Sequence, residues 1–115
     1  MEKEHESINS CKHKIMAIDD AMYVLGGKWK IHIIAALCFG EKRFSDLLSA
    51  ITGISGKMLS RELKDMETNL LVIRRIEATR PLKVNYELTE YGKKLIPLIN
   101  DLAEWGMAHR KEIRK

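Results

Sequence analysis

The chain has 115 residues, of which 45% are hydrophobic and 31% are charged, and its formal net charge at neutral pH is +4. This length and apolar content predict a single domain with its own core, and two cysteines are too few for a disulfide framework. No apolar run reaches the ~20 residues of a membrane span and no signal-peptide core follows Met1, so we expect a cytoplasmic protein without a membrane partner.

The positive charge is concentrated in the middle of the chain. Residues 28–94 contain 13 Lys and Arg against 8 Asp and Glu, a net of +5, which leaves −1 for the two flanks together. A basic centre favours a polyanionic partner, although so small a total charge is a weak signal by itself.

The amino-terminal part is expected to form a tail and then a first helix. Residues 1–10 are polar and charged, so we expect a flexible tail there and a single domain over 11–115. Apolar residues then recur at helical spacing up to Gly26-Gly27, a pair that suits a helix end because glycine tolerates a positive φ. These apolar residues are Ile15, Ile18, Met22 and Leu25.

A second helix is predicted up to Gly40. Its apolar positions are Trp29, Ile33, Ile34, Leu37 and Cys38. Lys28 and Lys30 flank Trp29; a solvated pair beside a core residue is the first interpretation, and a phosphate contact is the second. Lys42-Arg43 come next and could contact a DNA phosphate.

The stretch from Phe44 to Glu67 predicts two short helices around a tight turn at Thr52-Gly53-Ile54, with Ser55 as the N-cap of the second helix. At about 100° per residue, one side of this second helix is apolar and the opposite side is basic. The apolar side has Met58, Leu59, Leu63 and Met66, and the basic side has Lys57, Ser60, Arg61 and Lys64. Such a helix fits a DNA major groove about 12 Å wide; the alternative is an ordinary amphipathic surface helix.

After Glu67 the apolar period changes from helical to alternating. Leu71–Ala78 is rich in β-forming residues, Val84–Leu88 alternates strictly, and Pro81 lies in the turn between them. The resulting two-stranded hairpin must pack on the helices, because a hairpin alone is marginal in water. Arg80 and Lys83 at its tip serve solubility only or, beside a helix-turn-helix, form a wing that contacts DNA.

The last segment is expected to be a long helix. Thr89 is its predicted cap, and Pro97 should kink or divide it because proline lacks a backbone donor. The apolar stripe Leu98, Ile99, Leu102 and Trp105 extends beyond what a small domain needs for its core. A partner helix is therefore implied, most economically the same helix of a second subunit.

These motifs, in this order, resemble the HxlR family of bacterial winged-helix transcriptional regulators over residues 15–110. The matching runs are Gly27-Lys28-Trp29, Gly40 with Lys42–Leu47, Gly53–Ser55 with Lys57–Ser60, Tyr86–Gly92 and Glu104–Gly106. The resemblance implies an α+β, mainly α fold: a winged helix-turn-helix with a two-stranded β-hairpin wing and a long C-terminal dimerisation helix. It also implies a homodimer joined by the first and last helices, recognition by the helix from Ser55, and a wing at Thr79–Lys83. Double-stranded DNA is the expected partner, and no cofactor is expected.

The predicted site residues follow from both arguments. The expected DNA contacts are Arg43, Ser45, Ser55, Gly56, Lys57, Ser60, Arg61, Lys64, Arg80 and Lys83. The expected dimer contacts are Ile15, Ile18, Met22, Leu98, Ile99, Leu102 and Trp105.

Two positions depart from the family pattern. Many relatives have a Cys-Pro pair about ten residues before the Gly-Gly and use that cysteine to sense oxidants or electrophiles. Here Met16-Ala17 occupy that register, whereas Cys11 lies among Lys12, His13 and Lys14, so a redox role for Cys11 stays open. Leu70 stands where relatives commonly have glycine, and we expect its neighbour Asn69 to adopt the left-handed conformation there.

Other functions lack their motifs. The histidines and cysteines show no metal spacing and no Gly-rich phosphate loop or G-x-S-x-G is present, so neither an enzyme nor a metal site is expected. RNA binding would need exposed aromatic residues, whereas we expect Trp29 and Trp105 to be buried. We therefore expect a homodimeric regulator on a palindromic operator, with response to an oxidant or ligand left open. The alternative is a winged-helix protein–protein interaction module.

Overall fold

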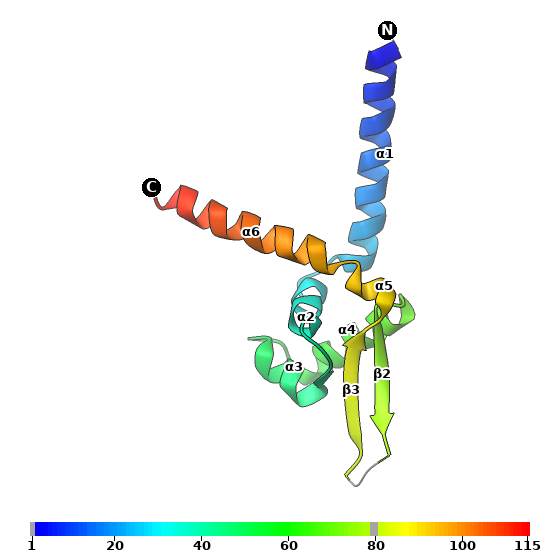
Figure 1. Ribbon diagram of the computed structural model, residues 1–115, viewed down its shortest axis with the longest axis vertical. Helices are drawn as coiled ribbons and strands as arrows, with labels where there is room; N and C mark the ends of the chain where they lie inside the picture. The colour runs from blue at the N-terminus through cyan, green and yellow to red at the C-terminus, as the bar shows by residue number, and fades with distance from the viewer. Residues whose placement is uncertain (1, 79–80) are drawn as a thin grey trace.

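The computed structural model describes residues 2–78 and 81–115, with side chains from Ser10 onward. The elements in chain order are α1 (Glu2–Leu25), α2 (Lys30–Leu37), β1 (Lys42–Arg43), α3 (Phe44–Ala50), α4 (Gly56–Thr68), β2 (Val72–Glu77), β3 (Lys83–Leu88), α5 (Glu90–Lys93) and α6 (Ile96–Ile113). Figure 1 shows α2, α3 and α4 gathered around the upper part of the β2–β3 hairpin, with α1 and α6 projecting away from them. The predicted mainly helical class with a β-hairpin and a long C-terminal helix is confirmed.

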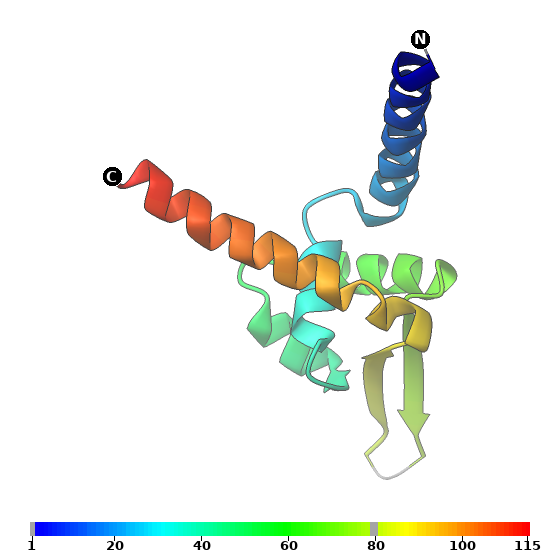
Figure 2. The same ribbon diagram turned by 45° about the horizontal axis from the view of Figure 1, so that its top comes forward.

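The two long helices make the chain extended. Its radius of gyration is 17.8 Å and its principal extents are 68 × 38 × 23 Å, whereas a compact domain of this length has a radius of gyration of roughly 13 Å. Figure 2 shows that α1 and α6 also diverge from each other in a second view. Both helices therefore leave much of their length unsupported by the rest of the chain.

The core lies between the short helices and the base of the hairpin. Its fully buried side chains come from α2, α3 and α4 and are Ile33, Ile34, Leu47, Leu59, Leu63 and Met66. The base of the hairpin closes this core with Leu71, Val72, Tyr86 and Leu88. The hairpin thus packs on the helices, as its marginal stability in isolation requires.

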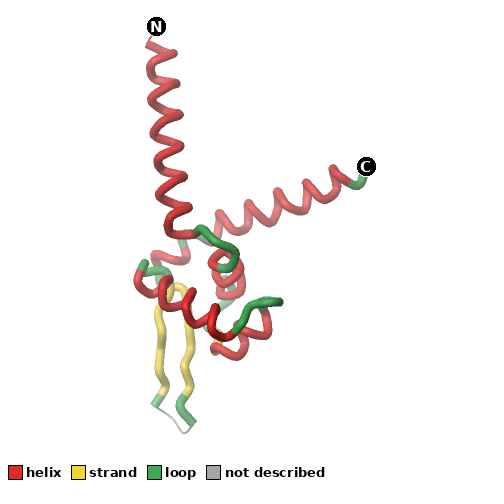
Figure 3. Tube along the Cα trace, turned by 180° about the vertical axis from the view of Figure 1, so that it is seen from behind, coloured by secondary structure: helices red, strands yellow, loops and turns green. Residues whose placement is uncertain are grey.

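The sheet has three strands rather than two. The predicted β2–β3 hairpin is present, and β1 pairs with β3 on its other side, so the strand order is β1-β3-β2. Figure 3 shows the two long strands of this sheet reaching away from α4. The two residues of β1, Lys42 and Arg43, are too few to show an alternating pattern in sequence, because at least four residues are needed to recognise one.

The end of α4 forms a Schellman motif, with Leu71 N–H bonded to Met66 C=O at 2.9 Å and Leu70 N–H bonded to Glu67 C=O at 3.0 Å. The residue in the left-handed region is Leu70, with φ 64°, whereas Asn69 has φ −88°. The expectation that Asn69 takes the strained angles is therefore wrong. Burial of Leu71 against the core sets the register of the motif and places Leu70 at its left-handed position.

The first and last helical segments end or divide where predicted, but α1 begins earlier than predicted. Leu25 ends α1 as predicted, but α1 begins at Glu2, so helix also runs through the residues assigned to the tail. The division into a flexible tail and a domain stays a prediction. Thr89 Oγ1 accepts from Gly92 N–H at 2.8 Å and so caps α5, and the last segment is divided before Pro97, which lies in the first turn of α6. Among the described helices, none is long and apolar enough to cross a membrane.

Candidate nucleic-acid interface

The helix pair α3–α4 is joined by a tight turn that the sequence builds locally. Gly53 has φ 89°, a conformation that side chains rarely adopt, and it packs near the ring of Trp29. Ser55 Oγ accepts a hydrogen bond from Met58 N–H at 3.1 Å, which satisfies one of the free amides of the first turn of α4. The predicted N-cap is confirmed.

The two sides of α4 have opposite environments. Leu59, Leu63 and Met66 have at most 1% of their surface exposed. On the other side the residues of the predicted basic face, Lys57, Ser60, Arg61 and Lys64, are all exposed. The apolar side thus fixes the helix on the core, and its basic side is presented to solvent.

Lys30 of α2 holds α4 in place by ion pairs with two of its acidic residues. Its ammonium lies 2.8 Å from a Glu62 carboxylate oxygen and 3.0 Å from one of Asp65, although Lys30 belongs to α2 and is itself 9% exposed. Burial alone would lower the pKa of Lys30, but hydrogen bonds and charge attraction from Glu62 and Asp65 raise it above its usual value. Both interpretations of Lys30 from sequence, a solvated lysine and a phosphate contact, are wrong. Lys28 is exposed, with its ammonium 4.7 Å from the centre of the Trp29 ring.

The cations on the outer face of α4 have no acidic partner among the described residues. Ion pairs occupy Lys30, Arg75, Lys93 and Lys115. Lys57, Arg61 and Lys64 form no ion pair within the described part of the chain. Their charges are therefore available to an external anion without first breaking an internal salt bridge.

The other predicted DNA contacts belong to the start of α3, the start of α4 and the hairpin. Arg43 and Ser45 are exposed where α3 begins, and Gly56 is half-buried at the start of α4. Lys83 is half-buried at the start of β3, whereas Arg80 lies outside the described residues. Arg74, which the sequence analysis did not single out, is a further exposed cation on β2, opposite Tyr86 in the strand register. The strand alternation could have found Arg74, since it places this charge between Val72 and Ile76 on the face that packs toward α4.

The predicted dimer residues are exposed, with one exception. The exposed ones are Ile15, Ile18, Met22, Leu98, Leu102 and Trp105. Ile99 is 7% exposed and belongs to the core of its own chain, so its assignment to the interface is not supported. Trp105 is 66% exposed and stacks on His109 with ring centres 4.8 Å apart. The expectation that Trp105 is buried is wrong for the single chain, because α6, to which it belongs, projects away from the core (Figure 1).

The two cysteines differ in exposure. Cys11 is exposed on α1, and Cys38 is half-buried after α2; both thiols are free. In the described residues, no group of three His, Cys, Asp or Glu side chains could hold a metal ion.

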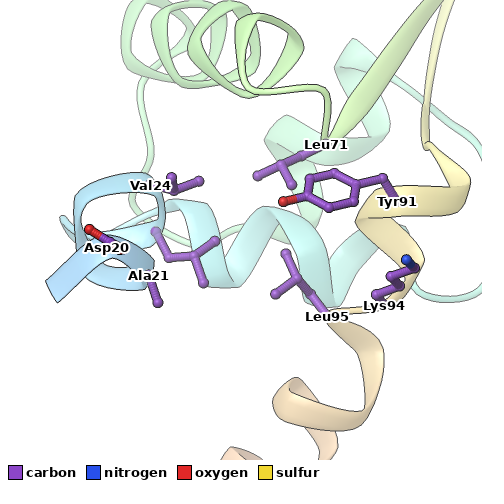
Figure 4. Close-up of a pocket in the computed structure, with 8 residues that line it drawn as sticks. Asp20, Ala21, Val24, Leu71, Tyr91, Lys94 and Leu95 are labelled. Atoms are coloured by element: carbon purple, nitrogen blue, oxygen red, sulfur yellow. The ribbon is translucent and has the colours of Figure 1, made fainter. Parts of the chain in front are cut away.

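A pocket of about 390 Å³ lies where α1, the start of β2 and α5 meet. Figure 4 shows Val24, Leu71, Tyr91 and Leu95 around it, with Asp20 and Lys94 at its edge. Its largely apolar lining is unsuited to a phosphate backbone, and none of the predicted DNA contacts lines it. This pocket is therefore separate from the nucleic-acid interface.

Comparison with known proteins identifies relatives of the whole arrangement. The HxlR-like helix-turn-helix family model matches residues 24–114. The chain is 38% identical over 99 residues to the HTH-type transcriptional regulator YdzF of Bacillus subtilis, which covers 85% of this chain and 91% of that protein. Among solved structures, the redox regulator HypR in its reduced form is similar with a TM-score of 0.80 and 32% identity, over 85% of this chain and 97% of that one. Diamide-treated YodB from Bacillus subtilis is similar with a TM-score of 0.67 and 37% identity, over 78% of this chain and 89% of that one. The predicted winged helix-turn-helix fold is confirmed.

Proposed function

Because the chain belongs to the HxlR-like helix-turn-helix family of transcriptional regulators, we propose that it binds a palindromic DNA operator as a homodimer. The observation that carries this proposal is the outer face of α4, where exposed Lys57, Arg61 and Lys64 have no acidic partner among the described residues. A basic helix held on a buried apolar stripe has the size and charge to enter a major groove. The proposed activity is binding alone, without a catalytic step.

The proposed contacts fall into two classes, contacts to base edges and contacts to phosphates. Ser60, Arg61 and Lys64 are placed to reach base edges, and Arg61 is the best candidate for a bidentate contact to guanine. Gly56 and Lys57 lie at the start of α4, where backbone amides and the helix dipole attract a phosphate. Arg43 and Ser45 at α3, with Lys83 and Arg80 of the wing, supply mainly sequence-independent charge.

The dimer is supported by the exposed apolar residues of α1 and α6. Ile15, Ile18 and Met22 on α1, and Leu102 and Trp105 on α6, all stand in solvent in the single chain. Scattered apolar residues are normal on a surface, but contiguous ones mark an interaction site. A two-fold axis through these helices would hold the two α4 helices about 34 Å apart, one turn of DNA or a multiple of it.

The test is selection of bound fragments from a pool of genomic DNA by the purified full-length chain, followed by sequencing. We expect enrichment of inverted repeats whose half-sites are spaced by whole turns of the duplex. Direct repeats or single half-sites would contradict the two-fold dimer. Absence of any enrichment would instead favour the protein–protein module, against which the charged centre of the α4 face already argues, since docking surfaces are depleted of charge at their centre.

A redox response is a second proposal, favoured by the exposure of Cys11 and by the similarity to HypR and YodB, the first named a redox regulator and the second solved after diamide treatment. A thiol reacts as the thiolate, and exposure makes it accessible to an oxidant. Operator binding by wild type should then change on treatment with diamide, and Cys11→Ser should abolish the change while Cys38→Ser keeps it. Operator binding that diamide leaves unmoved in the wild type would exclude this response.

A further inference from the structure

A small polar pocket lies in the corner between α4 and the hairpin. Its volume is about 240 Å³, and its lining comes from three elements: Ser60, Lys64 and Glu67 of α4, Arg74 of β2 and Tyr86 of β3. Two of the predicted base contacts, Ser60 and Lys64, thus belong to its lining. Arg74 has no role in the function proposed above.

The helical and strand periods explain why these residues meet. Ser60, Lys64 and Glu67 are spaced by four and three residues, so they share one side of α4. On the hairpin, Arg74 pairs in register with Tyr86, and opposite residues of an antiparallel pair project from the same face of the sheet. Arg75, the next residue of β2, projects from the other face and forms an ion pair of 2.9 Å with Glu87.

The charges in the corner favour a singly charged anion. Lys64 and Arg74 are exposed and form no ion pair within the described part of the chain. Glu67 is half-buried, and its Oε1 is buried without a hydrogen-bond partner among the described residues. The lining thus has two exposed cations and one carboxylate with a buried oxygen, and the formal charge of the three side chains is +1. That charge complements one phosphodiester, which carries a single negative charge.

We propose that Lys64 and Arg74 together hold one phosphate of the DNA strand that separates the two grooves. The proposal rests on the function proposed above: if α4 occupies a major groove and the wing reaches the adjacent minor groove, the intervening backbone crosses the corner between them. Arg74 can offer two parallel N–H donors to a phosphate, and Ser60 adds a hydroxyl donor. Lys64 is thereby reassigned: it contacts the phosphate rather than a base edge, and Arg61 remains the residue that discriminates between bases.

The test uses a fluorescent mixed-sequence duplex and the full-length chain, because a phosphate contact does not depend on the operator. Anisotropy is measured across a salt series for wild type, Arg74→Ala and Arg75→Ala. The two variants remove the same charge from adjacent residues of one strand, and circular dichroism checks that both are folded. The dimer has two such phosphate sites, so Arg74→Ala should lower the slope of log affinity against log salt by about 1.8. A salt increase of about fourfold should then weaken its binding about tenfold less than that of wild type. Arg75→Ala should leave the slope unchanged.

A double variant tests whether both cations share one phosphate. Lys64→Ala combined with Arg74→Ala should change the slope by less than the two single changes added together. If the phosphate is held only by both cations together, the first substitution already releases it, and the second has no further phosphate contact to remove. Fully additive changes would mean that Lys64 and Arg74 contact separate phosphates and would overturn the proposal that they share one.

The outcomes distinguish failure of the phosphate site from failure of the proposed function. Equal slopes for Arg74→Ala and Arg75→Ala, with wild type still bound to DNA, would overturn the phosphate site but leave the proposed DNA binding unaffected. A wild-type chain that fails to bind the duplex would overturn both. Titration with inorganic phosphate should show no binding at millimolar concentration; tight binding that Arg74→Ala abolishes would reassign the corner to a free anion and overturn the proposal.

Discussion

Helices α4 and α6 are both amphipathic, but they bury their apolar residues in different places. The stripe of α4 lies inside its own chain, with Leu59 and Leu63 almost without exposed surface, whereas Leu102 and Trp105 of α6 stand in solvent. Apolar burial stabilises a fold only where another element covers it. The stripe of α4 therefore stabilises the single chain, and that of α6 can contribute only when a partner is present.

The largest effect is expected from truncating the α4 stripe. Leu63→Ala removes a fully buried side chain and should cost about 2–5 kcal/mol of unfolding free energy. Urea unfolding followed by circular dichroism should give the same loss at every protein concentration. For Leu102→Ala, the loss should grow with concentration, because it acts through the dimer. Similar concentration-independent losses in both variants would erase the contrast between the helices.

The complementary change removes the aromatic residue of α6. Trp105→Ala should weaken the dimer by about 2 kcal/mol or more, which is roughly a thirtyfold rise in dissociation constant, because buried aromatic residues dominate interfaces. Sedimentation velocity over a dilution series measures the shift. Met107→Ala is the matched control, since Met107 is also exposed but projects from the opposite side of α6. A wild-type chain that stays monomeric at micromolar concentration would contradict the dimer.

The flank of α4 that faces α2 can be tested through Lys30. Lys30→Met leaves Glu62 and Asp65 without their partner and should cost about 1–3 kcal/mol, whereas Lys28→Met, the same change on an exposed neighbour, should cost little. The pKa of Lys30 is raised in the folded chain, so its stabilisation is fully present below the unfolded value of about 10.5 and declines as pH rises through the higher folded value. Urea unfolding should therefore give a constant wild-type advantage from neutral pH to about pH 10, and a smaller one above it. An advantage that fades already between neutral pH and about pH 9 would point to another group.

The outer face of α4 can be tested through Arg61. Arg61→Ala should reduce discrimination between the selected operator and random DNA by about 1–3 kcal/mol. Lys83→Ala on the wing should weaken both DNAs about equally, because a phosphate contact carries no sequence information. Anisotropy with both duplexes measures the two ratios. An unchanged ratio for Arg61→Ala would show that this face does not read bases.

The smallest effect is expected where α4 ends. Leu70→Gly should raise the free energy of unfolding by about 1 kcal/mol, because glycine adopts the left-handed conformation without the steric cost that leucine incurs. Asn69→Gly is the control: Asn69 has a negative φ and its side chain donates to Asp65 C=O at 3.0 Å, so this change should destabilise. Thermal unfolding of both variants distinguishes them. A loss of stability in Leu70→Gly would show that the exposed leucine stabilises this turn in another way.

The features that sequence alone determined depend on residues close together in the chain. The cap at Ser55 needs only the amide of Met58, the cap at Thr89 needs only that of Gly92, and Pro97 divides the last segment through its own missing donor. The apolar and basic sides of α4 follow from a period of 3.6 residues. Each of these interactions closes within one helical turn, so the local sequence is sufficient to specify it.

The remaining features were decided by contacts between distant parts of the chain. Lys30 reaches Glu62 and Asp65 across the α2–α4 packing, and β1 finds its partner in Tyr86 and Asn85. Leu70 rather than Asn69 takes the left-handed angles because Leu71 must be buried. Ile99 and Trp105 share one apolar stripe in sequence, yet the first is inside the core and the second stands outside it. Periodicity identifies which face of a helix is apolar, but only tertiary packing decides how far along the helix another element covers that face.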